Sequence, residues 1–361
     1  MRFRGMQLEL RTAHGLFSAD RLDEGTRLLL SHLPERELRT VLDVGCGYGA
    51  LGLPIAAALP DARVLCVDRD LVAARFCAHN ARLLELGNVE ARPSLGYDEV
   101  GEQGLDLVLC NVPARIGREG IRHLVEGGAR RASSHGEVRI VVIRDLRATV
   151  EALARERNWS CSLAAEGPRH DVFAIGPQVP EAAEDAALYA RDEVELAGLR
   201  FARPHDASED PGHAKEAVPL LVDLLPRAPR GDALVWRSAH GVASTVLALR
   251  GASVLAADRD LLALAFARKN AARHGAAIET RAAGWLPELA ERTYSLVVVE
   301  LSATAGPTVA SFELDAARRA IAKDGRAIIL ALDKIARPLR ESPARPAILG
   351  QRGAWTVLGI A

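Results

Sequence analysis

The residues best suited to do chemistry lie between Asp43 and Gly49, where an acid is followed by three glycines at alternate positions. An apolar run ends at Asp43 and a helix-like run follows Gly49, so we expect a strand, a tight loop and a helix N-terminus. Alternate glycines allow positive φ and let a ligand approach main-chain N–H groups without meeting a Cβ. A second apolar run ends in Asp68, which is placed to accept hydrogen bonds from ribose hydroxyls.

Two classes of ligand use this arrangement. Dinucleotide enzymes use G-x-G-x-x-G/A, which Gly45, Gly47 and Ala50 satisfy. Enzymes that use S-adenosylmethionine (SAM) have an acid, one residue and three alternating glycines, and the stretch from Asp43 to Gly49 fits that pattern completely. SAM carries an ammonium and a sulfonium group and no pyrophosphate, so an acid attracts it. The loop therefore favours SAM over NAD, with a tight turn that binds no ligand as the third possibility.

A second group of residues follows the third core strand, at Asn111 and Pro113. In methyl transfer to an exocyclic amine the nucleophile is a planar, weakly basic nitrogen, and acceptors aimed at its hydrogens help it pyramidalise toward the methyl group. The Asn111 side-chain carbonyl and a main-chain carbonyl held by Pro113 would supply such acceptors, and the rate would come from holding nitrogen and methyl in line. An Asn–x–Pro turn after a strand is the alternative without catalysis.

The composition is that of a soluble globular protein, with 361 residues, 49% hydrophobic residues and a formal net charge of −1. No overall basic balance indicates a nucleic-acid partner, although a local basic face could. The five cysteines are scattered and the ten histidines have no metal-ligand spacing, so we expect reduced, mostly buried thiols and no bound metal. We expect no signal peptide, no membrane span and a cytoplasmic location.

The elements that must position these residues alternate along the chain. Apolar strands are expected at 41–44, 63–67, 105–110, 138–143 and 172–175, and helices near 51–59, 70–86, 118–131 and 145–157. This alternation indicates an α/β fold with a parallel, doubly wound sheet.

The second half of the chain repeats the first. A constant offset of 190 residues relates three pairs: Asp68 and Asp258, Phe76 and Phe266, and Asn80 and Asn270. We therefore predict two tandem Rossmann-like, doubly wound domains that arose by internal duplication. An acidic stretch with prolines at 177–187 is the predicted linker between a domain at 1–176 and a domain at 188–361.

The two copies differ in chemistry. The second copy has Val235 in place of the acid, and Arg237 and Ala239 in place of two glycines. A Cβ at these positions disfavours the backbone geometry of the loop, and the side chains would fill the ligand's volume. Glu300 and Ser302 replace the asparagine and the proline. We therefore predict that the first domain is catalytic and the second degenerate.

Together with Gly15–Ser18, Leu22–Thr26 and Asn80, these motifs resemble the two-domain bacterial ribosomal-RNA guanine-N2 methyltransferases, built on the class I methyltransferase small domain. The resemblance covers roughly residues 6–176. It implies SAM-dependent methylation of an exocyclic amino nitrogen of guanine in ribosomal RNA, by a monomer that recognises ribosomal RNA or the ribosomal subunit. The implied cofactor-binding residues are Asp43, Gly45, Cys46, Gly47, Gly49, Asp68, Arg69, Ser94, Leu95 and Asn111, the catalytic residues are Asn111 and Pro113, and the substrate-binding residues are Phe17 and Arg115.

The sequence departs from the family pattern at two positions. Ala114 stands where the family has an aromatic residue that stacks on the base, a contact worth about 1–3 kcal/mol. Leu95 stands where an adenine-binding acid often lies. A non-catalytic RNA-binding or assembly protein, a SAM enzyme for a small molecule or a protein amide, and an NAD oxidoreductase remain as alternatives. Five arginines after Pro113 either meet phosphates or cover a solvated helix: Arg115, Arg118, Arg122, Arg130 and Arg131.

Overall fold

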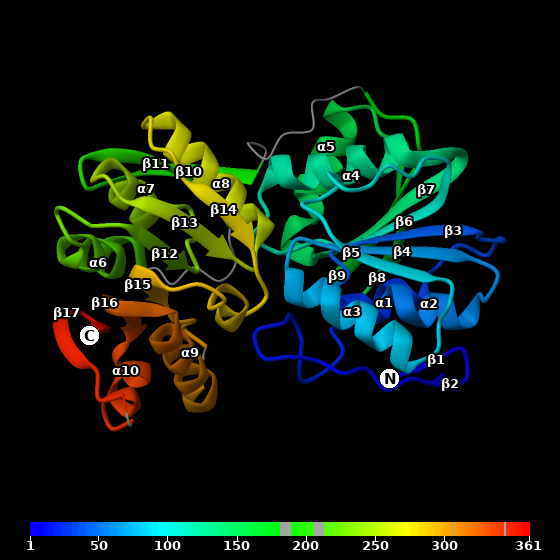
Figure 1. Ribbon diagram of the computed structural model, residues 1–361. Coiled ribbons are helices and arrows are strands. Elements are labelled where there is room, and N and C mark those ends of the chain that lie inside the picture. Colours follow the sequence, from blue (N-terminus) through cyan, green and yellow to red (C-terminus); the bar gives the residue numbers. More distant parts are fainter. Residues whose placement is uncertain (181–188, 206–212, 305, 343) are drawn as a thin grey trace. The chain divides into compact units, whose positions relative to one another are not determined.

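The computed structural model describes residues 1–180, 189–205, 213–304, 306–342 and 344–361. These residues form two compact units, one built from Met1–Tyr189 and one from Ala190–Pro204 and the described chain beyond it (Figure 1). Residues 181–187 of the predicted linker lie outside the described residues. The predicted domain limits, 1–176 and 188–361, stay a prediction.

The first unit is built on a seven-stranded sheet in the order β5-β4-β3-β6-β7-β9-β8. Its strands are β3 (Thr40–Val44), β4 (Arg63–Asp68), β5 (Val89–Pro93), β6 (Leu105–Asn111), β7 (Ala132–Ile143), β8 (Cys161–Glu166) and β9 (His170–Ile175). The central strands are almost continuously apolar and buried, as a parallel sheet covered on both faces requires. This is a doubly wound α/β fold of the Rossmann-like kind, so the predicted fold class is confirmed.

The expectation of an all-parallel sheet was wrong at one strand. β9 pairs antiparallel with both β7 and β8, because the chain returns from β8 through a hairpin rather than through a helix. The edge strands β5 and β8 were not predicted. They consist of exposed and half-buried residues and lack the apolar run that identifies the central strands.

Helices cover both faces of this sheet (Figure 1). One face carries α1 (Glu24–Ser31), α2 (Gly52–Ala58) and α3 (Leu71–Leu83), and the other carries α4 (Arg118–Arg131) and α5 (Arg147–Glu156). At the N-terminus, two short strands of two residues each form a pair, in which β2 (Met6–Gln7) lies against β1 (Arg2–Phe3).

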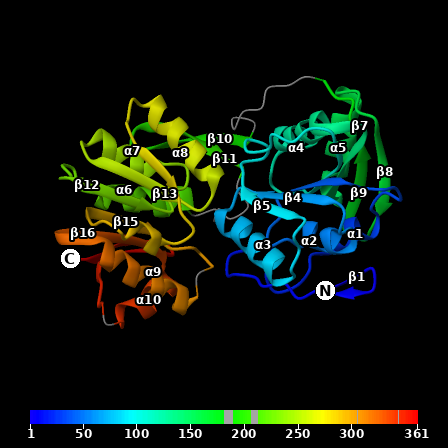
Figure 2. The ribbon, with the colours of Figure 1, turned by 45° about the vertical axis from the view of Figure 1, so that its right-hand side comes forward.

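The second unit repeats the plan, with strand order β14-β13-β12-β15-β16-β18-β17. Its sheet consists of β12 (Asp232–Trp236), β13 (Ser253–Asp258), β14 (Glu279–Ala282), β15 (Tyr294–Glu300), β16 (Ile321–Leu332), β17 (Ala347–Arg352) and β18 (Trp355–Ile360). Its helices are α6 (Val218–Leu224), α7 (Val242–Leu249), α8 (Leu261–Arg273), α9 (Pro307–Ala320) and α10 (Asp333–Arg340), and a hairpin of β10 (Ala190–Leu196) and β11 (Leu199–Pro204) precedes them. Figure 2 shows both sheets from a second side. The two sheets have the same strand order, as the predicted internal duplication requires.

Candidate active site

The predicted site residues of the first unit lie along one edge of its sheet. Asp43, Asp68 and Asn111 stand at or next to the carboxyl ends of β3, β4 and β6, and Ser94 directly follows β5. These four strands are neighbours and run parallel, so their carboxyl ends face the same side. Ligands of open α/β sheets bind at this edge, where the strand order reverses.

The glycine loop has the backbone that the sequence predicts, with φ of 77° at Gly45, 58° at Gly47 and 97° at Gly49. A Cβ added at Gly45 or Gly47 would meet nothing within 4 Å, whereas one at Gly49 would lie 2.4 Å from Leu53 Cδ1. The first two glycines therefore keep space open, and the third allows close packing against α2.

The main-chain N–H groups of this loop are already bonded within the protein. Those of Gly45 and Cys46 donate to the Val67 carbonyl at 2.8 and 3.0 Å, and that of Gly47 donates to Asp68 Oδ2 at 2.8 Å. A pyrophosphate needs such donors free, so the loop geometry disfavours a dinucleotide. A ligand would contact the open side of Gly45 and Gly47 instead.

Asp68 is half-buried and tied to the backbone on both sides. Its Oδ2 accepts from Gly47 and its Oδ1 accepts from the Asp70 N–H, both at 2.8 Å. Burial raises the pKa of this carboxyl to about 6, while the two backbone hydrogen bonds and the adjacent Arg69, also half-buried, oppose the rise. The carboxylate thus lies next to the loop with its orientation fixed.

Asp43 lies beneath the loop and is fully buried. Its Oδ2 accepts from the N–H of Gly52 at 2.9 Å, at the start of α2, and its Oδ1 has no hydrogen-bond partner among the described residues. Burial raises the pKa of this carboxyl well above its ordinary value. A cationic ligand above the loop would offset that penalty. Direct contact of Asp43 with the methionine moiety stays a prediction.

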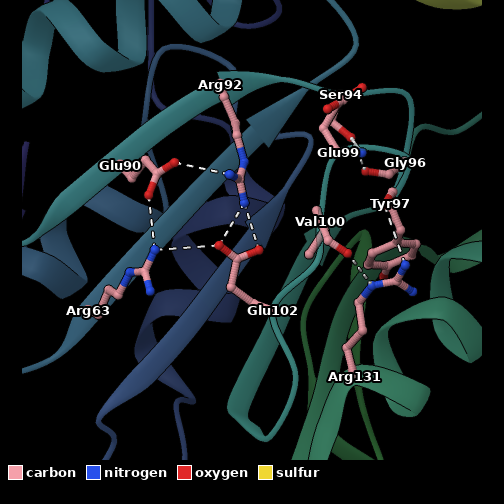
Figure 3. Close-up of polar contacts among 10 residues, drawn as sticks. All are labelled: Arg63, Glu90, Arg92, Ser94, Gly96, Tyr97, Glu99, Val100, Glu102 and Arg131. Atoms are coloured by element: carbon pink, nitrogen blue, oxygen red, sulfur yellow. Dashed lines mark hydrogen bonds and ion pairs between the residues drawn. The ribbon is translucent and has the colours of Figure 1, made fainter.

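The turn after β5 is shaped by Ser94 (Figure 3). Its N–H donates to the Asp68 carbonyl at 2.8 Å, its hydroxyl donates to the Gly96 carbonyl at 3.0 Å, and the same hydroxyl accepts from the Glu99 N–H at 3.0 Å. The turn carries the buried Leu95 next to Asp68, where an adenine ring would lie in the predicted complex.

Asn111 is half-buried at the end of β6. Its Nδ2 donates to Asp23 Oδ2 at 2.9 Å and to Thr26 Oγ1 at 3.0 Å. The sequence reasoning gave no role to Asp23 or Thr26, although both lie within the motif Leu22–Thr26 on which the resemblance rests. The exposed Pro113 has its own carbonyl bonded to the N–H of Ile116 at 3.1 Å. A proline ring restricts the backbone of the residue before it, so the carbonyl that Pro113 holds in place is that of the preceding residue.

Phe17 is 72% exposed although the residues around it are anchored. Leu16 is buried against Tyr48 of the glycine loop, and the Tyr48 hydroxyl donates to the Ser18 carbonyl at 3.3 Å. Arg115 is exposed in the turn before α4. The structure thus fixes the segment that carries Phe17 to the loop that carries the predicted cofactor contacts.

The other four arginines after Pro113 lie on α4 and contact neighbouring groups of the first unit. Arg118 pairs with Glu156, Arg122 pairs with Glu119 and with the fully buried Glu126, and Arg130 lies 3.9 Å from Glu126. Arg131 donates to the Val100 carbonyl at 3.1 Å and covers the Tyr97 ring at 4.7 Å, as Figure 3 shows. These contacts favour the structural interpretation of these four residues over phosphate binding.

The corresponding site in the second unit is filled. Arg237 and Ala239 take φ of 57° and 47°, so the loop keeps its geometry in spite of the Cβ atoms, contrary to our expectation that they would disfavour it. The Ala239 N–H still donates to Asp258 at 3.2 Å, and the Arg237 guanidinium lies 3.5 Å from Glu313. The cavity beside the loop, lined by Arg237, Ala239 and Glu300 among others, has a volume of about 20 Å³, which is room for about one water molecule.

A sequence model of the methyltransferase small domain matches residues 7–173. The chain is 34% identical over 165 residues to ribosomal RNA small subunit methyltransferase C of Pseudomonas fluorescens, a match that covers 44% of this chain and 48% of the relative. It is 42% identical over 101 residues to ribosomal RNA large subunit methyltransferase G of Streptomyces coelicolor, which covers 27% of each chain. The chain thus spans about half, or less, of the curated relatives it matches.

The whole chain resembles a solved structure of a methyltransferase. The structure is described as T. thermophilus 16S rRNA N2 G1207 methyltransferase (RsmC) in complex with AdoMet and guanosine. The TM-score is 0.74 at 16% sequence identity, and the match covers 100% of this chain and 96% of that one. At this identity the likeness shows the fold, including the second unit, which lies outside the small-domain match.

Three further findings concern metals, membranes and cysteines. In the described part of the chain, no three His, Cys, Asp or Glu side chains are grouped to hold a metal ion. No described helix is long and apolar enough to cross a membrane. All five cysteines are free thiols, four of them buried and Cys161 half-buried.

Proposed function

We propose that this protein is a SAM-dependent methyltransferase whose first unit methylates the exocyclic amino nitrogen of a guanine in ribosomal RNA. The observation that carries the proposal is the arrangement of Asp68, the open glycine loop and Asn111 side by side at the edge of one sheet. The names of the relatives supply the class of substrate.

The residues present fit SAM. Gly45 and Gly47 leave space that a Cβ would fill, the half-buried Asp68 offers acceptors for ribose hydroxyls, and the buried Asp43 places a carboxyl with an unbonded oxygen beneath the loop. SAM supplies an electrophilic methyl group on a sulfonium. We assign Leu95 and Ser94 to the adenine side, where they follow β5, and Cys46 and Arg69 to the loop and ribose sides.

At the other end of the site, Asn111 would accept a hydrogen bond from the target amine. Its carbonyl oxygen and the carbonyl before Pro113 hold the amine hydrogens, so that the nitrogen lone pair turns toward the methyl group. The nitrogen–carbon bond forms as the carbon–sulfur bond breaks, and the amine proton leaves to solvent afterwards. No side chain has to act as a strong base, because positioning supplies the rate.

Phe17 and Arg115 are the residues we assign to RNA. Phe17 offers an exposed aromatic face beside the glycine loop, and Arg115 offers a cation in the turn that follows Pro113. We propose that Phe17 stacks on a base, which Ala114 cannot do, and that Arg115 meets a phosphate. The protein would act as a monomer on ribosomal RNA or on a ribosomal subunit.

Calorimetric titration with SAM, followed by transfer of labelled methyl to ribosomal RNA and subunits that lack modifications, tests the proposal. We expect SAM binding that Gly47→Arg abolishes and that Ala239→Arg, at the matching position of the second unit, leaves unchanged. We expect methylation of RNA that Asn111→Ala lowers to a small, measurable residual rate. SAM binding without turnover would instead favour the non-catalytic RNA-binding protein, and turnover on free guanine nucleosides or protein amides would favour a different acceptor.

A further inference from the structure

We infer that Asp23 and Thr26 are positioning residues that fix which edge of the Asn111 side-chain amide faces the substrate. The inference rests on the proposed function, because it concerns how Asn111 would meet the target amine. It assigns a role to two residues at the N-terminus of α1, far in sequence from β6.

The two hydrogen bonds of Asn111 account for both hydrogens of its amide group. Nδ2 lies 2.9 Å from Asp23 Oδ2 and 3.0 Å from Thr26 Oγ1. A carboxylate can only accept a hydrogen bond, so the atom facing Asp23 must be the nitrogen. The carbonyl oxygen Oδ1 is therefore the edge that remains for a ligand.

This orientation decides whether Asn111 helps or hinders the reaction. A carbonyl oxygen accepts from an amine hydrogen, while a flipped amide would present its own N–H to that hydrogen and repel it. An unrestrained asparagine would sample both orientations, so part of the population would be unproductive. Asp23 and Thr26 remove that freedom before the substrate arrives.

Asp23 and Thr26 are themselves held in place. Asp23 is the N-cap of α1, and its Oδ2 accepts from the Thr26 N–H at 2.9 Å as well as from Asn111. Thr26 is only 4% exposed. A Cβ at the intervening Gly25 would lie 3.0 Å from Asp23 Oδ2 and 2.9 Å from His170 Cδ2. The spacing of aspartate, glycine and threonine is thus what brings two acceptors onto one amide.

The second unit keeps this contact and changes its chemistry. His213, in the turn before α6, places its Nε2 2.6 Å from Oε1 of Glu300, which ends β15 as Asn111 ends β6. A carboxylate at this position has no amide edge to orient. The contact therefore joins a helical segment to the end of a strand in both units, whatever its chemistry. The experiment must distinguish the positioning role of Thr26 from a purely structural one.

The experiment compares Thr26→Val and Asp23→Ser with two matched variants of the second unit. Valine keeps the shape of threonine, and serine keeps the N-cap but is too short to reach Asn111. Thr245→Val removes a buried hydroxyl that has no hydrogen-bond partner among the described residues, and Asp260→Ser changes the N-cap of α8. We expect Thr26→Val and Asp23→Ser to lower kcat by about 10- to 100-fold with SAM affinity and RNA KM unchanged. Thr26→Ser and Asp23→Asn, which keep an acceptor oxygen, restore the rate, and the two variants of the second unit match wild type.

A double variant separates positioning from structure. In Asn111→Ala, adding Thr26→Val should lower kcat no further, because the amide to be oriented is gone. Equal further loss in the double variant would show a structural role and overturn the inference. If Thr26→Val and Asp23→Ser both kept wild-type kcat while Asn111→Ala lost most of its activity, the inference would be overturned and the role of Asn111 would stand. Wild-type kcat in Asn111→Ala would overturn the role of Asn111 and the inference with it.

Discussion

Asn80 of the first unit and Asn270 of the second make the same three hydrogen bonds. Asn80 accepts from the Arg11 N–H and donates to the carbonyls of Arg11 and Tyr48, each at 2.8 Å. Asn270 bonds Ala202 and His240 in the same way, at 2.7–2.9 Å. Each asparagine is fully buried and ties the glycine loop, or its counterpart, to the segment that precedes the sheet. The second unit therefore keeps the hydrogen bonds that hold the loop in place, although Arg237 and Ala239 replace two of the glycines.

Asn80→Ala is predicted to lower both stability and SAM affinity. The change removes three hydrogen bonds to the backbone of Arg11 and Tyr48, of which the one to the Tyr48 carbonyl is buried, and costs about 3 kcal/mol of the free energy of unfolding. Loosening the Tyr48 carbonyl frees the loop, so the Kd for SAM should rise by about tenfold, or 1.4 kcal/mol. Urea unfolding and calorimetric titration measure the two effects.

Asn270→Ala is the matched control. It breaks the same bonds in the second unit, so it should lower the free energy of unfolding by a similar amount and leave the Kd for SAM unchanged. A similar loss of SAM affinity in both variants would mean that the effect of Asn80 is not local to its loop.

Asp68 predicts a pH dependence of SAM binding. Burial raises the pKa of this carboxyl to about 6, and the ionised form is the stronger acceptor for ribose hydroxyls. The Kd for SAM should therefore be constant above about pH 7 and rise toward tenfold per unit below about pH 6. The stability of the fold depends on pH in the opposite direction. The raised pKa means that the folded protein binds this proton more tightly than the unfolded chain does. The contribution of Asp68 to stability is complete below its unfolded pKa and is lost as the pH rises through about 6.

Asp68→Asn should weaken SAM binding at neutral pH and flatten its pH profile. Asp258, whose pKa burial raises to about 7, is the control, since Asp258→Asn should leave the profile of SAM affinity unchanged. Calorimetric titration between pH 5 and 8 gives both profiles. A profile that persists in Asp68→Asn would assign the titration to another buried carboxyl, with Asp43 as the first candidate.

The position of the second glycine, Gly47 in the first unit and Ala239 in the second, offers a reciprocal pair of substitutions. Ala239 holds a φ of 47°, so Ala239→Gly should raise the free energy of unfolding by about 0.5–1 kcal/mol. Gly47→Ala should lower it by a similar amount, since the added Cβ meets open space and only φ is strained. Only Gly47→Ala should weaken SAM binding. Urea unfolding by tryptophan fluorescence and titration with SAM check both changes, and an equal loss of SAM affinity in Ala239→Gly would contradict the assignment of the site to the first unit.

The core strands and the functional edge of the sheet could be predicted because the sequence patterns that indicate them are local. Buried parallel strands are runs of apolar residues, and the acid or amide that ends each run marks the functional edge of the sheet, as Asp43, Asp68 and Asn111 do. The strand β9 was expected, but as part of a parallel sheet, because its apolar residues are the same whichever way the chain runs.

The parts that could not be predicted depend on contacts distant in sequence. Nothing local indicates that Asp23 and Thr26 reach Asn111, which lies 88 and 85 residues away. Nor does the sequence show that the buried Glu126 pairs with Arg122 and Arg130 of α4 and with Arg157. Arg115 remains as an exposed cation close to Pro113 in the sequence.

Phe17 should contribute to RNA binding and hardly at all to folding. Its ring is 72% exposed, so Phe17→Ala removes little buried surface and should change the free energy of unfolding by less than about 0.5 kcal/mol. The loss of one base stack should weaken RNA binding by about 1–3 kcal/mol, and Phe17→Trp should retain it. Phe312, which is 46% exposed on α9, is the control, and Phe312→Ala should leave RNA affinity unchanged. Filter binding of unmodified ribosomal RNA at fixed salt measures the effect. Wild-type affinity in Phe17→Ala would mean that the base is held without an aromatic partner at this position.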